Sequence, residues 1–469
     1  MTKRIRTGEA KTFRAFIDFM KEKPQRVELG IWAAVLLALG VALHLLYPTP
    51  FVFPDSGSYV NSAASGTFNV YRPMGYSQYL GLLHGIRDRR IFGAFCLFAV
   101  AAPRLLFCTN FLMSDSLFHT LTILFVTTAL WVACSRNLIW LIWHLLVFAL
   151  LYKVRYAGMF YVPVTLLAIW FMPSGSVRTR VGYMALPVLV FGLLYMSAKR
   201  TYMQQTGVDT FSAFSGWQLL NNASVLIPEA NRELTPESFA SQDLQTLHAF
   251  MRTCPDSVFS ERNMLETFCM WDNKLPYKYF LFHVVKTTGR PYANAWVALG
   301  VLYGEYAREL IRHYPMSYVE RFLWPSVASL FRPMDITEER FALENEPMYR
   351  DYYGLTAERY EHAHRVFAAL NPVRRAMHYV YWSALGLSLA CLAIAWKSLG
   401  RANRKRRQLL LMLAAFVVVY LGASALASPN TAWRYTMPVF LPSLALTASL
   451  ADYFLDMRRS RRSAVKESA

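Results

Sequence analysis

Six charged side chains are the residues of this chain that are best suited to chemistry, because each lies at or near the end of a long apolar segment. They are Asp55, Arg72, Asp115, Lys153, Arg155 and Arg434. A carboxylate can take a proton from a hydroxyl nucleophile or bind a divalent metal, and Arg or Lys can bind a phosphate. Charges at the edge of a membrane are costly unless they are paired, solvated or used. We therefore expect these six to form a site for an anionic substrate.

Each of these residues also has a structural interpretation. Asp55 and Asp115 stand in Asp-Ser settings that are typical of helix N-caps. Arg155 and Arg434 stand at span ends, where long basic side chains reach for the lipid headgroups. The structural alternative stays open for each residue taken singly, and the gathering of all six on one face favours the functional interpretation.

The elements that must position these side chains are predicted to be membrane helices. The chain has 469 residues, of which 55% are hydrophobic and 17% charged, and the charges gather in short blocks. A helix needs roughly 20 apolar residues to cross a bilayer. The sequence predicts an all-α polytopic membrane protein with about ten spans. They are 29–47, 75–86, 91–107, 116–134, 138–152, 159–172, 181–196, 379–396, 409–427 and 437–455.

Basic blocks predict the orientation. Lys and Arg are concentrated in 1–28, 397–407 and 457–469, and the positive-inside rule places such blocks in the cytoplasm. Both termini are then cytoplasmic, so the number of spans is even, and 75–86 must count either as a short tilted span or as part of a re-entrant element. The net charge of +19 is explained by these flanks, so we expect membrane lipids and no nucleic acid as partners.

The predicted domains follow from this topology. A basic leader (1–28) precedes an N-terminal transmembrane module (29–197) that contains a first outer loop at 48–74. A mostly helical outer, periplasmic domain (198–376) is followed by a C-terminal transmembrane module (377–456) and a basic tail (457–469). We expect the bacterial inner membrane as the location.

The predicted outer domain contains candidate sugar contacts and two cysteines. Trp217 could stack on a pyranose ring and Asn221 could bind hydroxyls, although Trp217 could equally pack the domain onto the membrane. A disulfide between Cys254 and Cys269 is possible in an oxidising compartment, and spacing alone cannot establish it.

Five motifs carry a resemblance, and they follow one another in order along the chain. They are PDSGSYV with YRPMGYSQYL, LMSDSLFHTLTIL, KVRYAGMFYVPV, LIRHYPMSYVERFL and WRYTMPVFLPSLAL. The set resembles the GT-C glycosyltransferases, which are multispan membrane enzymes that use a polyprenyl-phosphate-linked sugar as donor and include the protein mannosyltransferases and aminoarabinose transferases. The family usually has Glu where this chain has Asp115.

The resemblance implies an inverting transfer of a sugar onto a glycan, lipid or protein acceptor at the outer face. Asp55 would be the catalytic base, and Asp115 would assist acceptor placement; the two would also hold a divalent metal if one is used. The donor phosphate would be bound by Arg72, Lys153, Arg155 and Arg434, and Tyr59 and Tyr71 would contact substrate. No other cofactor is implied.

Two alternatives stay open, and the first is of another class. A transporter or flippase of a lipid-linked or anionic substrate would use the same outer cations, but it would need charges or broken helices near the membrane midplane, where this sequence offers few. An O-antigen polymerase or ligase would depend on arginines in large outer loops rather than on an acid directly after the first span.

Overall fold

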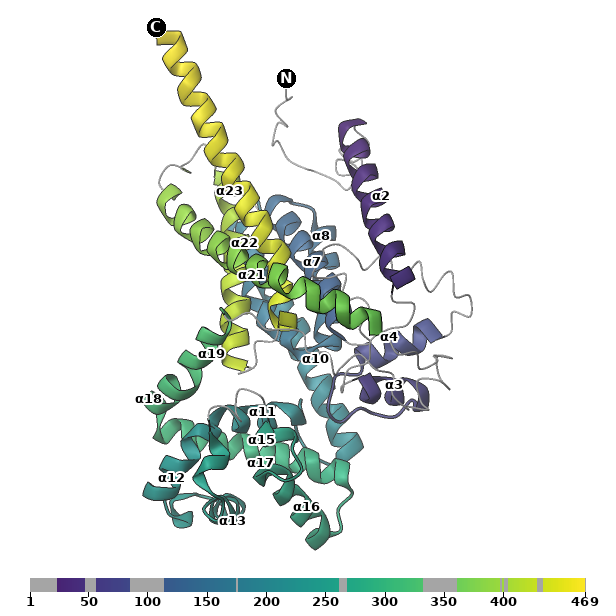
Figure 1. Cartoon of the computed structure of the whole chain (residues 1–469), viewed down its shortest axis with the longest axis vertical. Helices are drawn as coiled ribbons and strands as arrows, with labels where there is room; N and C mark the ends of the chain where they lie inside the picture. Colours follow the sequence, from purple (N-terminus) through teal and green to yellow (C-terminus); the bar gives the residue numbers. More distant parts are fainter. Residues whose placement is uncertain are drawn as a thin grey trace.

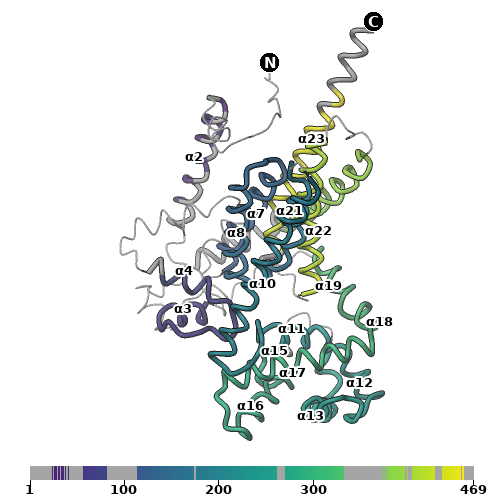
Figure 2. Tube along the Cα trace, turned by 180° about the vertical axis from the view of Figure 1, so that it is seen from behind, coloured from purple at the N-terminus to yellow at the C-terminus, as the bar shows by residue number. Residues whose placement is uncertain are grey.

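The described part of the chain is helical. The computed structural model describes residues 23–46, 56–84, 114–173, 176–260, 268–331, 361–396, 399, 404–427 and 433–468, and these residues form helices and connections without a strand. Figure 1 shows a bundle of long helices with a separate group of shorter helices at one of its ends, and Figure 2 shows the same two layers from behind. The predicted all-α class is confirmed.

Five of the described helices are long and apolar enough to cross a membrane. They are α7 (Ser114–Cys134), α10 (Val177–Thr206), the segment His378–Ala395 of α21 (Glu361–Ala395), α22 (Arg404–Ala427) and the segment Thr436–Leu455 of α23 (Trp433–Ser468). The apolar helix α8 (Leu138–Val154) and the 3-10 turn η1 (Tyr156–Tyr161) that continues into α9 (Val162–Phe171) are shorter. A membrane protein is therefore supported, whereas the total of about ten spans stays a prediction.

The first three predicted spans differ in how much of each one the structure describes. Helix α2 (Lys23–Leu46) covers most of the predicted span 29–47. The predicted span 75–86 contains the helix α4 (Gly75–His84), and its last two residues lie outside the described residues, so this span stays a prediction. The predicted span 91–107 lies outside the described residues.

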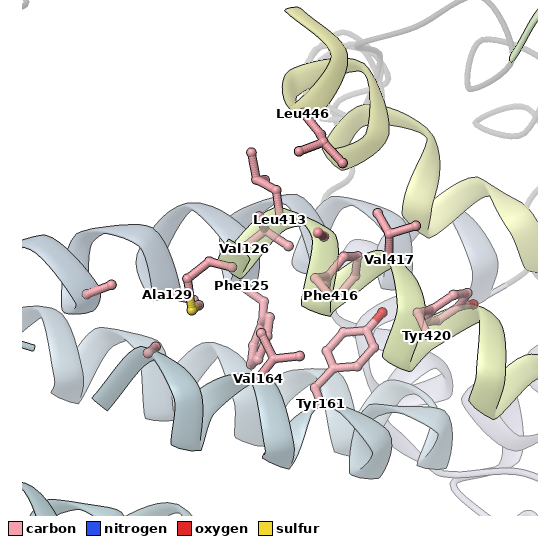
Figure 3. Close-up of a cluster of buried hydrophobic side chains, with 14 of the residues drawn as sticks. Phe125, Val126, Ala129, Tyr161, Val164, Leu413, Phe416, Val417, Tyr420 and Leu446 are labelled. Atoms are coloured by element: carbon pink, nitrogen blue, oxygen red, sulfur yellow. The ribbon is translucent and has the colours of Figure 1, made fainter. Parts of the chain in front are cut away.

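One hydrophobic core joins helices from both halves of the chain. Phe125 of α7 and Val164 of α9 lie against Phe416 and Val417 of α22, and Leu446 of α23 lies beside them (Figure 3). The ring of Tyr161 lies at the centre of this cluster, and its centroid is 5.2 Å from that of Phe416. The predicted N-terminal and C-terminal transmembrane modules thus share a single packed interior.

A buried histidine ties three helices of this bundle together. His144 of α8 is fully buried, with Nδ1 2.9 Å from the hydroxyl of Thr128 and Nε2 2.9 Å from the hydroxyl of Thr165. The Thr128 hydroxyl also donates to the carbonyl of Leu124 at 2.8 Å. A neutral ring with both nitrogens bonded is the inexpensive way to bury this side chain.

A helical domain follows α10. Its helices are α11 (Ala213–Ala223), α12 (Ile227–Glu233), α13 (Gln242–Met251), α15 (Phe268–Trp271), α16 (Pro276–Thr288), α17 (Tyr292–His313), α18 (Pro315–Tyr318), a π-helical turn (Val319–Leu323) and α19 (Trp324–Ser329). Together they enclose a second hydrophobic core that is separate from that of the bundle. This domain lies at the opposite end of the bundle from the C-terminal half of α23 (Figure 1).

Helices α11 and α17 approach so closely that only glycine fits between them. A Cβ added to Gly216 would lie 1.6 Å from the carbonyl oxygen of Gly300, and one added to Gly300 would lie 2.4 Å from the carbonyl oxygen of Ala213. These contacts are with backbone atoms, which cannot move aside as a side chain can. The two helices therefore form the fixed frame of the domain.

Three sets of contacts fix the domain to the bundle. Helix α10 runs without a break to Thr206, past the predicted domain boundary at 198. Asn222 of α11 donates from Nδ2 to the carbonyls of Leu426 and Ala427 at 3.3 Å, and Ser326 of α19 donates to the carbonyl of Ala425 at 2.8 Å. The last turn of α22 thus serves as the docking point for two domain helices.

Candidate functional site

The predicted outer loop 48–74 contains a helix, α3 (Ser56–Ser65), and a tight turn that leads into α4. Asn69 is 3% exposed and organises this turn. Its Oδ1 accepts hydrogen bonds from the backbone N–H groups of Tyr71 and Arg72 at 3.0 and 3.1 Å, and its Nδ2 donates to the carbonyl of Ser58 at 3.1 Å. Asparagine often closes turns in this way. The turn thereby holds Tyr71 and Arg72 in fixed positions.

The start of α4 is packed against the end of α8. A Cβ on Gly75 would lie 2.4 Å from the carbonyl oxygen of Lys153, so only glycine allows the two backbones to approach this closely. The backbone of the RPMG turn and the backbone of the KVR segment are thus in direct contact, although 78 positions of sequence separate Gly75 from Lys153 (153 − 75).

An ion pair lies beside this contact. Asp115, in the first turn of α7, pairs through Oδ1 with Nη1 of Arg155, the residue at which α8 ends. The Arg155 guanidinium also lies over the ring of Phe118, 5.6 Å from its centroid. The hydroxyl of Tyr59 in α3 lies 2.9 Å from that of Ser114, the neighbour of Asp115. The ion pair of Asp115 and Arg155 therefore lies beside helix α3 of the outer loop.

Arg72 connects this place to the helical domain. Its guanidinium carbon lies 5.8 Å from the ring centroid of Tyr59 and 5.6 Å from that of Phe214 in α11. Tyr71, its neighbour, makes an edge contact with Trp296 of α17, with the ring centroids 5.1 Å apart. Burial raises the pKa of the Tyr71 hydroxyl, so this group stays protonated at neutral pH. We call Tyr59, Arg72, Asp115 and Arg155 the junction cluster.

The other three predicted charged residues, Asp55, Lys153 and Arg434, are not part of the junction cluster. Asp55 lies outside the described residues, directly before Ser56, where α3 begins. Arg434 belongs to α23, and its side chain also lies outside the described part. Lys153 is exposed, one residue before Val154, the last residue of α8. The structure thus brings together four of the predicted site residues and leaves the roles of Asp55 and Arg434 as predictions.

Trp217 and Asn221 are inside the helical domain. Both are 0% exposed, and the indole N–H of Trp217 donates to the carbonyl of Trp296 at 3.0 Å. A sugar therefore cannot stack on Trp217 in this structure, which favours a packing role for this ring. It packs within the core of its own domain rather than onto the membrane, because Trp296 covers one of its faces with the ring centroids 3.8 Å apart.

The described residues contain no group of three His, Cys, Asp or Glu side chains that is arranged to hold a metal ion. A metal bound between Asp55 and Asp115 stays a prediction. Cys254 is a free thiol in this structure, and the side chain of Cys269 lies outside the described part of the chain.

An aromatic cluster in the helical domain was not predicted. Trp217, Trp296 and Trp271 form a stack of three indoles, and the second and third are 5.8 Å apart with an angle of 20°. Beside this stack lies Lys278 of α16, which is only 6% exposed. The WQLL, MWDNKLPYKY and PYANAW segments that supply these side chains are rich in aromatic residues, which was the one available signal. Their meeting depends on how the helices pack.

A scan against protein-family models, a search of curated proteins and a search of solved structures each gave no match to this chain.

Proposed function

We propose that this protein transfers a sugar from a polyprenyl-phosphate donor to an acceptor, with the junction cluster as part of its active site. The observation that carries the proposal is that Tyr59, Arg72, Asp115 and Arg155 lie together although they come from three motifs far apart in the chain. The resemblance to GT-C enzymes requires these motifs to meet at one site. Their contact in the structure supports the proposal.

The cluster has the charges that such a reaction needs. When the bond between the anomeric carbon and the donor phosphate breaks, negative charge grows on the phosphate oxygens. Arg155 presents N–H donors in a planar fork, and its ion pair with Asp115 fixes the orientation of that fork. A planar guanidinium matches the geometry of a phosphate. Donors that are already oriented stabilise developing charge without reorganisation in the transition state.

Arg72 supplies a second cation to the cluster. It lies between the aromatic rings of Tyr59 and Phe214, which restrict its position by cation–π contact. Asp55 precedes α3 by one residue and is proposed to remove the proton from the acceptor hydroxyl as its oxygen attacks the anomeric carbon. The sugar configuration inverts, the polyprenyl phosphate leaves, and the proton stays on Asp55 until solvent takes it.

The test is sugar transfer from a panel of radiolabelled polyprenyl-phosphate sugars in membranes that contain wild type or Asp55→Asn. Asparagine keeps the size of the side chain but cannot act as a base, so we expect a loss of at least ~100-fold, typical of a general base. Ser65→Ala is the matched control, because Ser65 lies on the same helix α3 and is exposed. Equal transfer by wild type and Asp55→Asn would exclude Asp55 as the base, and transfer from no donor would exclude the proposed reaction.

A further inference from the structure

The stack of three indoles in the helical domain ends on an accessible ring. Trp217 and Trp296 are both 0% exposed, whereas Trp271, the outer member, is 40% exposed. The inner pair is nearly parallel at 9° and holds the plane of the outer ring. A flat exposed indole that is supported from behind is the kind of surface on which the apolar face of a sugar ring stacks, because little side-chain entropy remains to be lost on binding.

A buried ammonium group lies beside the same stack. Lys278 Nζ is 4.3 Å from the ring centroid of Trp296 and 5.7 Å from that of Trp271. The Lys278 ammonium group donates one hydrogen bond to the hydroxyl of Tyr292 at 2.6 Å. Among the described residues, Lys278 makes no ion pair with a carboxylate. Burying an ammonium group without an opposite charge is costly, and cation–π contacts recover only part of that cost.

The cluster has more hydrogen-bond donors than acceptors. Lys278 has three N–H donors and no acceptor, and the buried indole N–H of Trp296 has no partner among the residues that the structure describes. Buried hydrogen-bond donors without a partner are rare in native proteins, so their presence usually has a structural or functional explanation. The uncompensated positive charge of Lys278 beside the exposed ring of Trp271 fits a ligand that brings oxygen atoms and negative charge.

The cluster is connected to the proposed active site by direct contacts. Phe214 lies between Arg72 and Trp271, with its ring 5.6 Å from the guanidinium carbon and 6.0 Å from the indole centroid. Tyr71, the neighbour of Arg72, makes its edge contact with Trp296 of the same stack. A ligand held at Trp271 would therefore be connected through the ring of Phe214 to Arg72, the residue that we propose to bind the donor phosphate, and an acceptor site belongs near the donor site.

We propose that Trp271 and Lys278 form the acceptor subsite and that the acceptor sugar carries a negative charge, as a carboxylate or a phosphate. Trp271 takes the apolar face of the ring, and Lys278 pairs with the anionic oxygen atoms. The assignment of the bound sugar as the acceptor rests on the proposed transferase function. The binding of an anionic sugar does not depend on that function and is measured without any transfer.

The experiment is saturation-transfer NMR on the full-length protein in detergent, with glucuronate, glucose 6-phosphate, glucose and inorganic phosphate as probes. We expect signals from ring C–H groups of at least one anionic sugar and much weaker signals from glucose. A comparison of the signals from glucuronate and glucose 6-phosphate shows whether the site prefers a carboxylate or a phosphate. Displacement by inorganic phosphate alone would show that charge dominates over stacking.

Three variants test the roles of the two residues. Lys278→Met should weaken anionic-sugar binding by roughly 10-fold or more, as expected for loss of a hydrogen bond to a charged group, and should remove the preference over glucose. Lys278→Arg should keep the preference, and Trp271→Ala should weaken every sugar. Trp324→Ala is the matched control, because this tryptophan is 69% exposed on α19 and lies outside the cluster.

The outcomes separate this proposal from the transferase proposal. A wild type that binds glucose as well as it binds the anionic sugars, or a Lys278→Met protein that keeps the preference at unchanged melting temperature, would overturn the subsite. Anionic-sugar binding without sugar transfer from any donor would leave the subsite standing and overturn the transferase. Sugar transfer without anionic-sugar binding would leave the transferase standing and overturn the subsite.

Discussion

The ion pair between Asp115 and Arg155 gives the junction cluster a defined geometry. Arg155 lies at the end of α8, and Asp115 lies in the first turn of α7, where a carboxylate also interacts favourably with the positive end of the helix dipole. The pair is largely screened from solvent, with the side chains 20% and 8% exposed, so it is less weakened by salt than a surface pair. Its main consequence is that the guanidinium has one orientation.

Arg155→Lys tests whether that orientation matters. Lysine keeps the charge but has no planar fork, so it cannot hold Asp115 and a phosphate in the same fixed arrangement. We expect sugar transfer to fall by ~10- to 100-fold with protein abundance unchanged, because oriented donors contribute several kcal/mol in the transition state. Arg178→Lys on the exposed first turn of α10 is the control. Full activity in Arg155→Lys would reduce the role of Arg155 to charge alone.

Lys278 makes the stability of the helical domain depend on pH. Burial lowers its pKa from 10.5 to about 8, so between these values the unfolded chain holds a proton that the folded protein has released. Stability therefore rises with pH in this window. The neighbouring hydroxyls of Tyr71 and Tyr292 have raised pKa values, about 12 for Tyr292, and stay protonated there.

The measurement is the melting temperature of wild type and Lys278→Met from about pH 7.5 to 9.5. Wild type should gain stability relative to the variant as pH rises, by at most about 3 kcal/mol for a shift of this size. A constant difference between the two proteins across this range would show that Lys278 keeps an ordinary pKa.

At the scale of elements, the site depends on the approach of α4 to α8. The backbone contact between Gly75 and the carbonyl of Lys153 brings the RPMG turn beside Arg155, and Asn69 fixes the turn from the other side. Neither contact involves a charged side chain. They are nonetheless the contacts that place Arg72 within the junction cluster.

Gly75→Ala should therefore damage the site without a change in any charged group. The new Cβ would lie 2.4 Å from a backbone oxygen, so α4 must move, and we expect a loss of ~1–3 kcal/mol of stability as for other overpacked positions. Gly81→Ala in the same helix is the control, because its Cβ would meet its nearest atom at an ordinary 3.9 Å. Thermal unfolding and sugar transfer are the two measurements, and equal behaviour of the two variants would contradict the close contact.

At the scale of the whole molecule, two cores lie one after the other along the bundle axis. The first joins α7 to α9 with α21 to α23, and the second lies within the helical domain. The junction cluster contacts both cores, because Arg155 lies over Phe118 of the first core and Arg72 lies over Phe214, which packs against the second.

The orientation of the molecule in the membrane follows from its charges and can be measured. The positive-inside rule predicts that the helical domain faces outward and that the basic end of α23 faces the cytoplasm. In a cysteine-free background, Asp243→Cys should react with a membrane-impermeant maleimide in intact cells, and Arg458→Cys should react only after permeabilisation. Both positions are exposed. The reverse labelling pattern would invert the topology and exclude an outward-facing site.

The sequence alone determined the helical class, the apolar helices and the candidate charges, because hydrophobicity along one chain segment decides whether that segment can cross a bilayer. It also singled out Arg72, Asp115 and Arg155 through local motifs. The tertiary structure decided which of these meet. It paired Asp115 with Arg155, buried Trp217, and exposed Trp271 at the end of an indole stack beside Lys278. Such contacts depend on backbone approaches, as at Gly75 and Gly300, that join positions far apart in the chain and that no local pattern encodes.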